Sequence, residues 1–185
     1  MKHKKEERFR KKLKYTLKNM FKTDTNIEIS DKRSLLYKVF VDQELNYTPS
    51  TPKNPKRGDF AFETDILISK KLKSDTFIPL IVLEVKHGGF STHDVLTYSS
   101  KAIKHKEIYP YLRYGLIVSK KKNIDTKFFI HNVGFDFAIS FEKLDKNALR
   151  DIKNMIKNQI EIAENILSIF SGKKVKYYNT QVTIK

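Results

Sequence analysis

The chain contains no cysteine among its 185 residues. This absence excludes a disulfide framework and any zinc site built on thiolates. No apolar run approaches the ~18 residues that a membrane-spanning helix needs. The charged stretch from Lys2 to Lys14 also lacks the hydrophobic core of a secretion signal. The sequence therefore predicts a cytoplasmic protein that is not embedded in a membrane.

Acidic residues and arginines are both scarce. The chain has 21 Asp and Glu against 37 Lys and Arg, which gives a formal net charge of +16, and most of the cations are lysines. Such a surplus attracts polyanions at long range and raises encounter rates with nucleic acid. We therefore expect a nucleic acid as the partner, with a membrane surface, an acidic protein or a simple coding bias toward lysine as the alternatives.

The length suits one domain with a hydrophobic core of its own, and no internal repeat or low-complexity linker divides residues 1–185. Apolar periodicity and turn residues predict the order of elements. Helices are expected over 2–21 (a basic helix), about 31–45, 92–108 and 144–170, strands over 60–69, 77–85, 112–119, 128–133 and 135–141, a proline-rich loop over 47–58, and a C-terminal arm over 173–185. This order predicts an α/β fold in which helices flank a mixed central β-sheet.

Charged residues stand at the ends of two apolar strands within the segment 65–86. Asp65 opens the first apolar run, Glu84-Val85-Lys86 ends the second, and a polar turn separates the runs. Residues two apart on a strand share a face, so Glu84 and Lys86 point the same way, and the hairpin can bring Asp65 close to them. Two carboxylates and an ammonium that converge suit a hard divalent cation and a polarised water. The alternative is an ordinary Glu–Lys pair at a solvated strand end.

The pattern of Asp65, Glu84 and Lys86 resembles the signature of the PD-(D/E)XK nuclease superfamily, which includes many restriction endonucleases and junction resolvases. Thr64 stands where the family usually has a proline. The resemblance implies a restriction-endonuclease-like fold and Mg²⁺-dependent hydrolysis of double-stranded DNA, most like a type II restriction endonuclease, with Mn²⁺ as a possible substitute. It also implies that Asp65, Glu84 and the backbone carbonyl of Val85 bind the metal, and that Lys86 orients or deprotonates the attacking water.

Several polar residues are candidates to join this site. In the family that the chain resembles, an acid from a preceding helix often contributes, and Glu44 near the end of the expected helix 31–45 fits best, followed by Glu28. Glu63 shares a strand face with Asp65. The helix that follows Lys86 brings further side chains near the strand ends: His93, Asp94, Tyr98 and Lys101. Each of these residues could equally be an ordinary surface group.

Two other functions stay open at this point. A Holliday-junction resolvase on the same fold would cleave branched DNA without regard to sequence. A non-catalytic DNA-binding protein on the same scaffold would bind DNA without cutting it.

The helix expected over 144–170 also predicts an assembly. Ile162, Ile166 and Ile169 widen its apolar stripe beyond one packing surface. Cleavage of both strands of a duplex with one site per chain calls for two sites, which a two-fold axis supplies. We therefore expect a homodimer that forms through this helix or through the arm after Gly172, although a central helix of a single domain can also be apolar on most sides.

Overall fold

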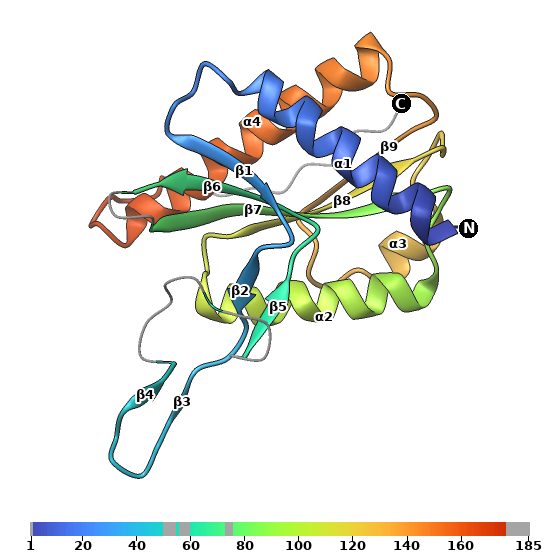
Figure 1. Ribbon diagram of the computed structural model, residues 1–185. Helices are drawn as coiled ribbons and strands as arrows, with labels where there is room; N and C mark the ends of the chain where they lie inside the picture. Colours follow the sequence, from blue (N-terminus) through green and yellow to red (C-terminus); the bar gives the residue numbers. More distant parts are fainter. Residues whose placement is uncertain (1, 50–54, 56–59, 73–75, 177–185) are drawn as a thin grey trace.

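The computed structural model describes residues 2–49, 55, 60–72 and 76–176 (Figure 1). Its helices are α1 (Lys2–Met20), α2 (Thr92–Ile108), α3 (Thr126–His131) and α4 (Lys146–Ile169). Its strands are β1 (Ile27–Asp31), β2 (Ser34–Leu36), β3 (Phe40–Val41), β4 (Tyr47–Thr48), β5 (Ala61–Glu63), β6 (Ile66–Lys71), β7 (Phe77–His87), β8 (Arg113–Ser119) and β9 (Phe137–Phe141). Among the helices of the described residues, none combines the length and the apolar character needed to cross a membrane.

The central sheet contains five strands in the order β1-β6-β7-β8-β9. Strands β1, β6 and β7 pair antiparallel, whereas β7, β8 and β9 run parallel to one another. The middle strand, β7, is buried from Pro79 to Val85, as expected for a strand that is covered on both faces. The predicted class, a mixed central β-sheet flanked by α-helices, is confirmed, and so is the β6–β7 hairpin.

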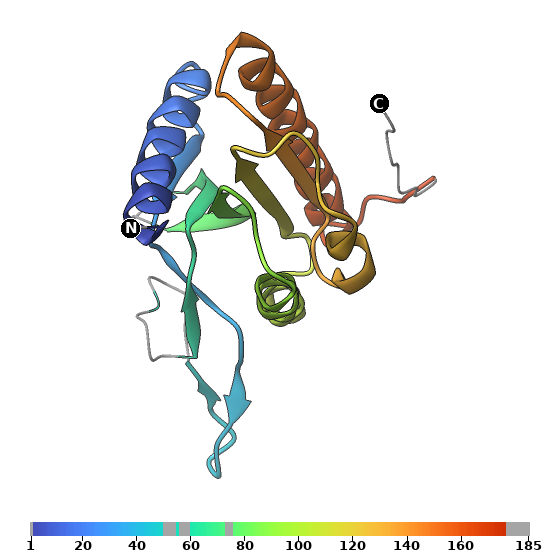
Figure 2. The same cartoon turned by 90° about the vertical axis from the view of Figure 1, so that its right-hand side faces the viewer.

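Helices cover both faces of this sheet (Figure 2). Helices α1 and α4 pack on one face, and α2 and α3 pack on the other. The first face is held by a core that includes Leu13, Leu17, Ile152 and Ile156; the second is held by a core that includes Val95, Ala102, Phe128 and Leu116. The predicted apolar stripe of the first helix is buried at Phe9, Leu13, Leu17 and Phe21. The predicted long C-terminal helix begins after Asp145, whose side chain accepts the backbone N–H of Ala148.

The predicted helix over 31–45 is wrong, because this segment forms strands β2 and β3 and a turn. The carboxylate of Asp31 does not cap a helix; it accepts hydrogen bonds from Arg10 and Lys14 of α1. Lys32 has a φ of 54°, a left-handed conformation that interrupts any helix. Strands β3 and β4 then form a hairpin that projects away from the layers, and its turn carries Glu44 (Figure 1).

The predicted strand over 60–69 is interrupted. Thr64 and Asp65 separate β5 from β6, and both the backbone N–H and the hydroxyl of Thr64 donate to the Arg33 carbonyl. Strand β5 pairs with β2 instead of extending the central sheet. Asp65 is therefore released from strand pairing at the point where β6 begins. The predicted loop over 47–58 contains β4, and its basic residues Lys53, Lys56 and Arg57 lie outside the described residues.

The predicted strand over 128–133 is also wrong, because this segment lies mostly in the short helix α3. Its apolar run is not a buried strand: Phe128 is buried, whereas Phe129 is 63% exposed and Ile130 is 69% exposed. The side chain of Asn132 accepts the N–H groups of Gly134 and Phe135 and so ends the helix. The next predicted strand, over 135–141, is present as β9. Most of the arm expected over 173–185 lies outside the described residues.

The buried face of α2 includes polar residues. Val95, Ser99 and Ala102 are buried, whereas Leu96 is half exposed. His105 is completely buried, and its Nε2 lies 3.3 Å from the Leu35 carbonyl of β2. Because β2 covers this flank of α2, the flank becomes part of the packing surface.

Candidate functional site at the end of strand β7

Asp65 reaches across to β7 with its side chain. It stands immediately before Ile66, which pairs with Leu83 at the start of the β6–β7 register. Its Oδ2 accepts the backbone N–H of Val85 at 2.9 Å. Because the N–H and the C=O of one strand residue face the same neighbouring strand, the carbonyl of Val85 also faces the side of Asp65. The structure thus brings Asp65 together with the Glu84-Val85-Lys86 segment.

Glu84 is a buried carboxyl group with one hydrogen-bond donor. Its side chain is almost fully buried, and its Oε1 accepts the hydroxyl of Tyr114 at 2.7 Å. Burial, and next the charge of Asp65, raise the pKa of Glu84 to about 8. Burial also raises the pKa of Asp65 despite the hydrogen bond from Val85. Without a cation between them, the two carboxyl groups therefore hold a proton at neutral pH.

Lys86 is held by acids from two helices. Its Nζ lies 3.0 Å from Oδ1 of Asp94 and 3.6 Å from Oε1 of Glu6, and it sits 4.9 Å from the ring centroid of Tyr98. Burial alone would lower its pKa, but the Tyr98 hydroxyl, Asp94 and Glu6 outweigh burial, and the pKa of Lys86 is raised. Lys86 is therefore a fixed ammonium group, and it does not take a proton from water near neutral pH.

The N-terminus of α2 fixes the partner of Lys86. The side chain of Asp94 accepts the backbone N–H and the hydroxyl of Ser91, and Ser91 Oγ accepts the backbone N–H of Asp94. This reciprocal capping box anchors the Asp94 carboxylate while its other oxygen faces Lys86. The hydrogen bonds from Ser91 and Lys86 outweigh burial and lower the pKa of Asp94. The N-terminal cap of α2 at Ser91 thus also positions the site.

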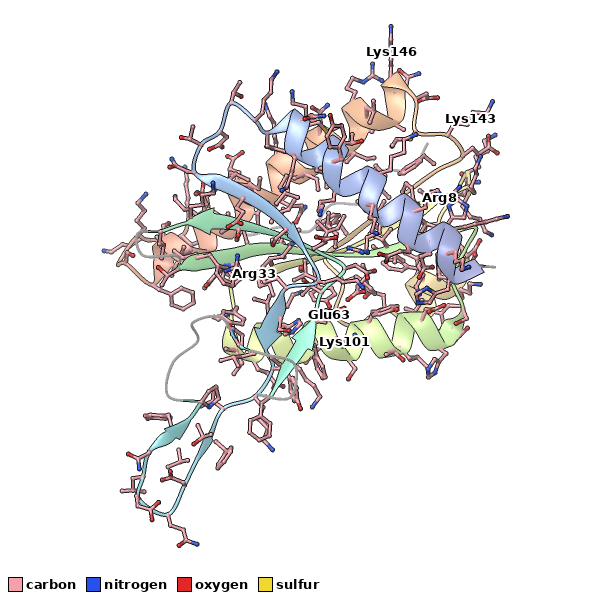
Figure 3. All side chains as sticks on the ribbon, viewed as in Figure 1. Arg8, Arg33, Glu63, Lys101, Lys143 and Lys146 are labelled. Atoms are coloured by element: carbon pink, nitrogen blue, oxygen red, sulfur yellow. The ribbon has the colours of Figure 1, made fainter. Side chains whose placement is uncertain are left out.

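Of the other residues predicted to join the site, Lys101 lies near it, whereas His93 and Glu63 are exposed. Lys101 lies 5.3 Å from the ring centroid of Tyr98. Its positive charge partly offsets the rise in the pKa of Glu84, so Lys101 belongs to the surroundings of the site. His93 is exposed, and its Nε2 lies 3.4 Å from the hydroxyl oxygen of Thr97, one turn later on α2. Figure 3 marks Glu63 on β5 and Lys101 on α2; the Glu63 side chain is exposed.

Two predicted acids lie elsewhere. Glu44 is exposed in the turn of the projecting β3–β4 hairpin, where its backbone N–H donates to Asp42. Glu28 belongs to β1 and forms an ion pair with Arg33 at 3.5 Å. The expectation that one of them joins the site rested on a helix over 31–45, which the structure replaces with strands.

Sequence reasoning missed two residues of the site, Glu6 and Tyr114. Helix α1 delivers Glu6 to Lys86, and the charge of Glu6 also raises the pKa of Asp65. The available signal was that Glu6 and Glu7 are the acidic residues of an otherwise basic helix. Tyr114 had no such signal, because its contact with Glu84 depends on the register between β7 and β8.

The oxygen atoms at this strand end fit a hard divalent cation. Within the described part of the chain, no cluster of three or more His, Asp or Glu side chains could hold a metal. Mg²⁺, however, is usually bound by one or two carboxylates and completes its octahedron with water and phosphate oxygens. Asp65, Glu84 and the Val85 carbonyl supply such a set. Burial and, next, repulsion by Asp65 raise the pKa of Glu84, and a bound cation would offset both effects.

No protein-family model, curated protein or solved structure matches this chain.

Proposed function

We propose that this protein is a Mg²⁺-dependent endonuclease that hydrolyses phosphodiester bonds of double-stranded DNA in the cytoplasm. A restriction-endonuclease-like arrangement of the mixed α/β fold, and the activity of a type II restriction endonuclease, are part of this proposal. The observation that carries it is the buried Glu84 carboxyl beside Asp65, with Lys86 held at the same strand end. Burial of two carboxyl groups side by side is costly unless a cation compensates for it.

Each residue has a distinct role in this proposal. Asp65, Glu84 and the Val85 carbonyl would hold the cation, which polarises a phosphoryl oxygen and acidifies water when bound. Lys86, whose pKa is raised, stays charged and stabilises the negative charge that develops on the phosphate. Asp94 and Tyr98 are positioning residues, because they act through the Lys86 ammonium.

The proposal is tested by incubating the protein with a long mixed-sequence duplex and, separately, with a four-way junction, in Mg²⁺, in Mn²⁺ and in EDTA. Discrete duplex fragments that require a divalent cation are the expected result. Cleavage confined to the junction would instead indicate a resolvase. Binding of both substrates without cleavage would indicate a non-catalytic DNA-binding protein and would overturn the proposal.

Binding to duplex DNA is expected to weaken steeply with salt. The net charge of +16 lets the protein displace condensed counterions, and the slope of log K against log salt is about −0.9 for each phosphate neutralised. Fluorescence anisotropy with a labelled duplex in EDTA, across a salt series, measures this slope. A nearly flat dependence would mean that the lysine surplus has no part in DNA binding.

A homodimer remains part of the proposal, with the C-terminal end of α4 at its interface. Ile162 and Ile166 are partly exposed there, Ile169 is 39% exposed, and Phe170 is 63% exposed. An apolar stripe of this kind is stabilised when a second copy covers it.

Sedimentation equilibrium at micromolar concentration is expected to give twice the 21.8 kDa chain mass. The double variant Ile169→Asp with Phe170→Asp should be monomeric, because charged groups oppose the apolar contact. The control, Phe129→Asp with Ile130→Asp, removes apolar groups of α3 that are at least as exposed and should remain dimeric. A wild-type mass of one chain, with and without DNA, would refute the dimer.

A further inference from the structure

A pocket lies at the same end of the sheet as the candidate site. The last residues of the three parallel strands line it: His87 of β7, Ser119 of β8 and Phe141 of β9. These three residues are in register, so they form one row across the sheet. In α/β folds, ligands bind in the crevice outside the carboxyl ends of parallel strands.

Five cationic side chains line this pocket, which we call the basic pocket: Lys5, Arg8 and Lys12 of α1, Lys120 after β8, and Lys143 before α4. Figure 3 shows Arg8 and Lys143 at the same end of the molecule. All five are exposed, and none forms an ion pair with an acid among residues 2–49, 55, 60–72 and 76–176. Glu142 is the acid that lines the pocket with them. The pocket is thus lined by five positive charges and by the single negative charge of Glu142.

The floor of the basic pocket is apolar. Phe9, Phe141 and Leu144 line it. The ring of Phe9 lies 5.9 Å from that of Phe141 and 6.0 Å from that of His87, as measured between centroids. Nδ1 of His87 lies 2.8 Å from Ser119 Oγ, so polar atoms stand at the edge of this aromatic floor. A rim that attracts phosphate and a floor that attracts an aromatic ring together suit a nucleotide.

The volume of the basic pocket limits which part of a nucleic acid can enter it. The pocket has a volume of about 460 Å³, which suits a single small-molecule-sized group. A base-paired duplex presents phosphates to a cationic rim, but its stacked bases cannot enter such a pocket. An unpaired nucleotide can place its phosphate on the rim and its base on the floor, as in proteins that bind single strands through cations and aromatic side chains.

The pocket is next to the candidate site but on the opposite face of β7. Glu84 and Lys86 point toward Tyr114 and α2, whereas His87, one residue later, points toward α1. A nucleic-acid strand that crosses the end of β7 could therefore contact both places.

We propose that the basic pocket binds one unpaired nucleotide of a nucleic-acid strand, with its phosphate on the Lys and Arg rim and its base on the Phe9–Phe141–Leu144 floor. This binding does not depend on cleavage. A protein without nuclease activity would still show it, and a nuclease without it would remain a nuclease.

The test measures binding in EDTA by fluorescence anisotropy, with two single-stranded probes that carry the same number of phosphates. One probe is a thymidine dodecamer, and the other is an abasic dodecamer. The wild-type protein is expected to bind the thymidine strand about tenfold more tightly, because the base contact adds to the phosphate contact. This comparison requires no mutation.

Two variants locate the contact. Arg8→Glu with Lys143→Glu changes the rim of the pocket, and Lys18→Glu with Lys22→Glu makes the same change of net charge at exposed lysines outside it. The two introduced carboxylates repel the phosphate and so keep the nucleotide out of the pocket, where its base would meet the floor. The rim variant is therefore expected to bind both probes equally, whereas the control keeps the tenfold preference. Equal binding of both probes by the wild-type protein would overturn the proposal, as would a rim variant that keeps the preference or a control that loses it.

Discussion

Replacement of Asp65, Glu84 or Lys86 by alanine is expected to reduce Mg²⁺-dependent cleavage at least about 10²- to 10³-fold. Loss of either carboxylate removes a ligand of the cation, and loss of Lys86 removes a fixed ammonium from the reacting phosphate. The fold should survive each change, because Asp65 and Lys86 lie at strand ends and removal of Glu84 takes an ionisable carboxyl group out of the buried interior. Single-turnover cleavage of supercoiled plasmid, with thermal unfolding in parallel, measures both effects.

Alanine variants of an exposed glutamate and of an exposed lysine are the matched controls. Glu44→Ala removes an exposed carboxylate in the β3–β4 turn, and Lys104→Ala removes an exposed lysine from α2. Both controls should cleave at close to the wild-type rate. If one of the three site variants retains cleavage within about threefold of wild type, that residue has no direct part in the chemistry.

The free energy of unfolding of the metal-free protein is expected to depend on pH through Glu84. The pKa of Glu84 rises from its ordinary value of 4.5 to about 8 in the folded protein. The folded state therefore keeps a proton that the unfolded chain releases. The contribution of Glu84 to the stability of the folded state is fully present below about pH 4.5 and is lost as the pH rises through 8. The free energy of unfolding should fall by several kcal/mol over this interval, since one pKa unit corresponds to about 1.4 kcal/mol.

Glu84→Gln is expected to remove most of this pH dependence. The amide stays neutral at every pH and can still accept the hydroxyl of Tyr114. Above pH 8 the variant should therefore be more stable than the wild-type protein. Urea unfolding at several pH values in EDTA measures the effect, and Glu63→Gln, at an exposed position, is the control. A Glu84→Gln profile parallel to that of the wild type would show that Glu84 is ionised in the folded protein.

Patterns of neighbouring residues in the sequence predicted helix α1, strand β7 and the β6–β7 hairpin. Phe9, Leu13 and Leu17 mark α1 because their spacing matches one helix face, and the unbroken apolar run before Glu84 marks a strand that is buried on both faces. The turn between two such runs was enough to predict the hairpin that brings Asp65 to Val85. The central residues of the candidate site could therefore be proposed from the sequence.

The remaining features depend on tertiary contacts. Leu35 and Leu36 fit a helix face as well as they fit strand β2, and the deciding factors were the pairing of β2 with β5 and the engagement of Asp31 by Arg10 and Lys14. The raised pKa of Lys86 depends on Tyr98 and Asp94 of α2 and on Glu6 of α1, two helices on opposite faces of the sheet. No spacing along the chain reveals that these acids meet.

The most direct test of the proposed cation-dependent nuclease compares four reactions on the same supercoiled plasmid. Wild-type protein and Glu84→Gln are each incubated under single-turnover conditions, with Mg²⁺ and with EDTA. Cleaved plasmid is expected in one reaction, wild type with Mg²⁺, and intact plasmid is expected in the other three. Cleavage by Glu84→Gln in Mg²⁺ at the wild-type rate, or intact plasmid in all four reactions, would contradict it.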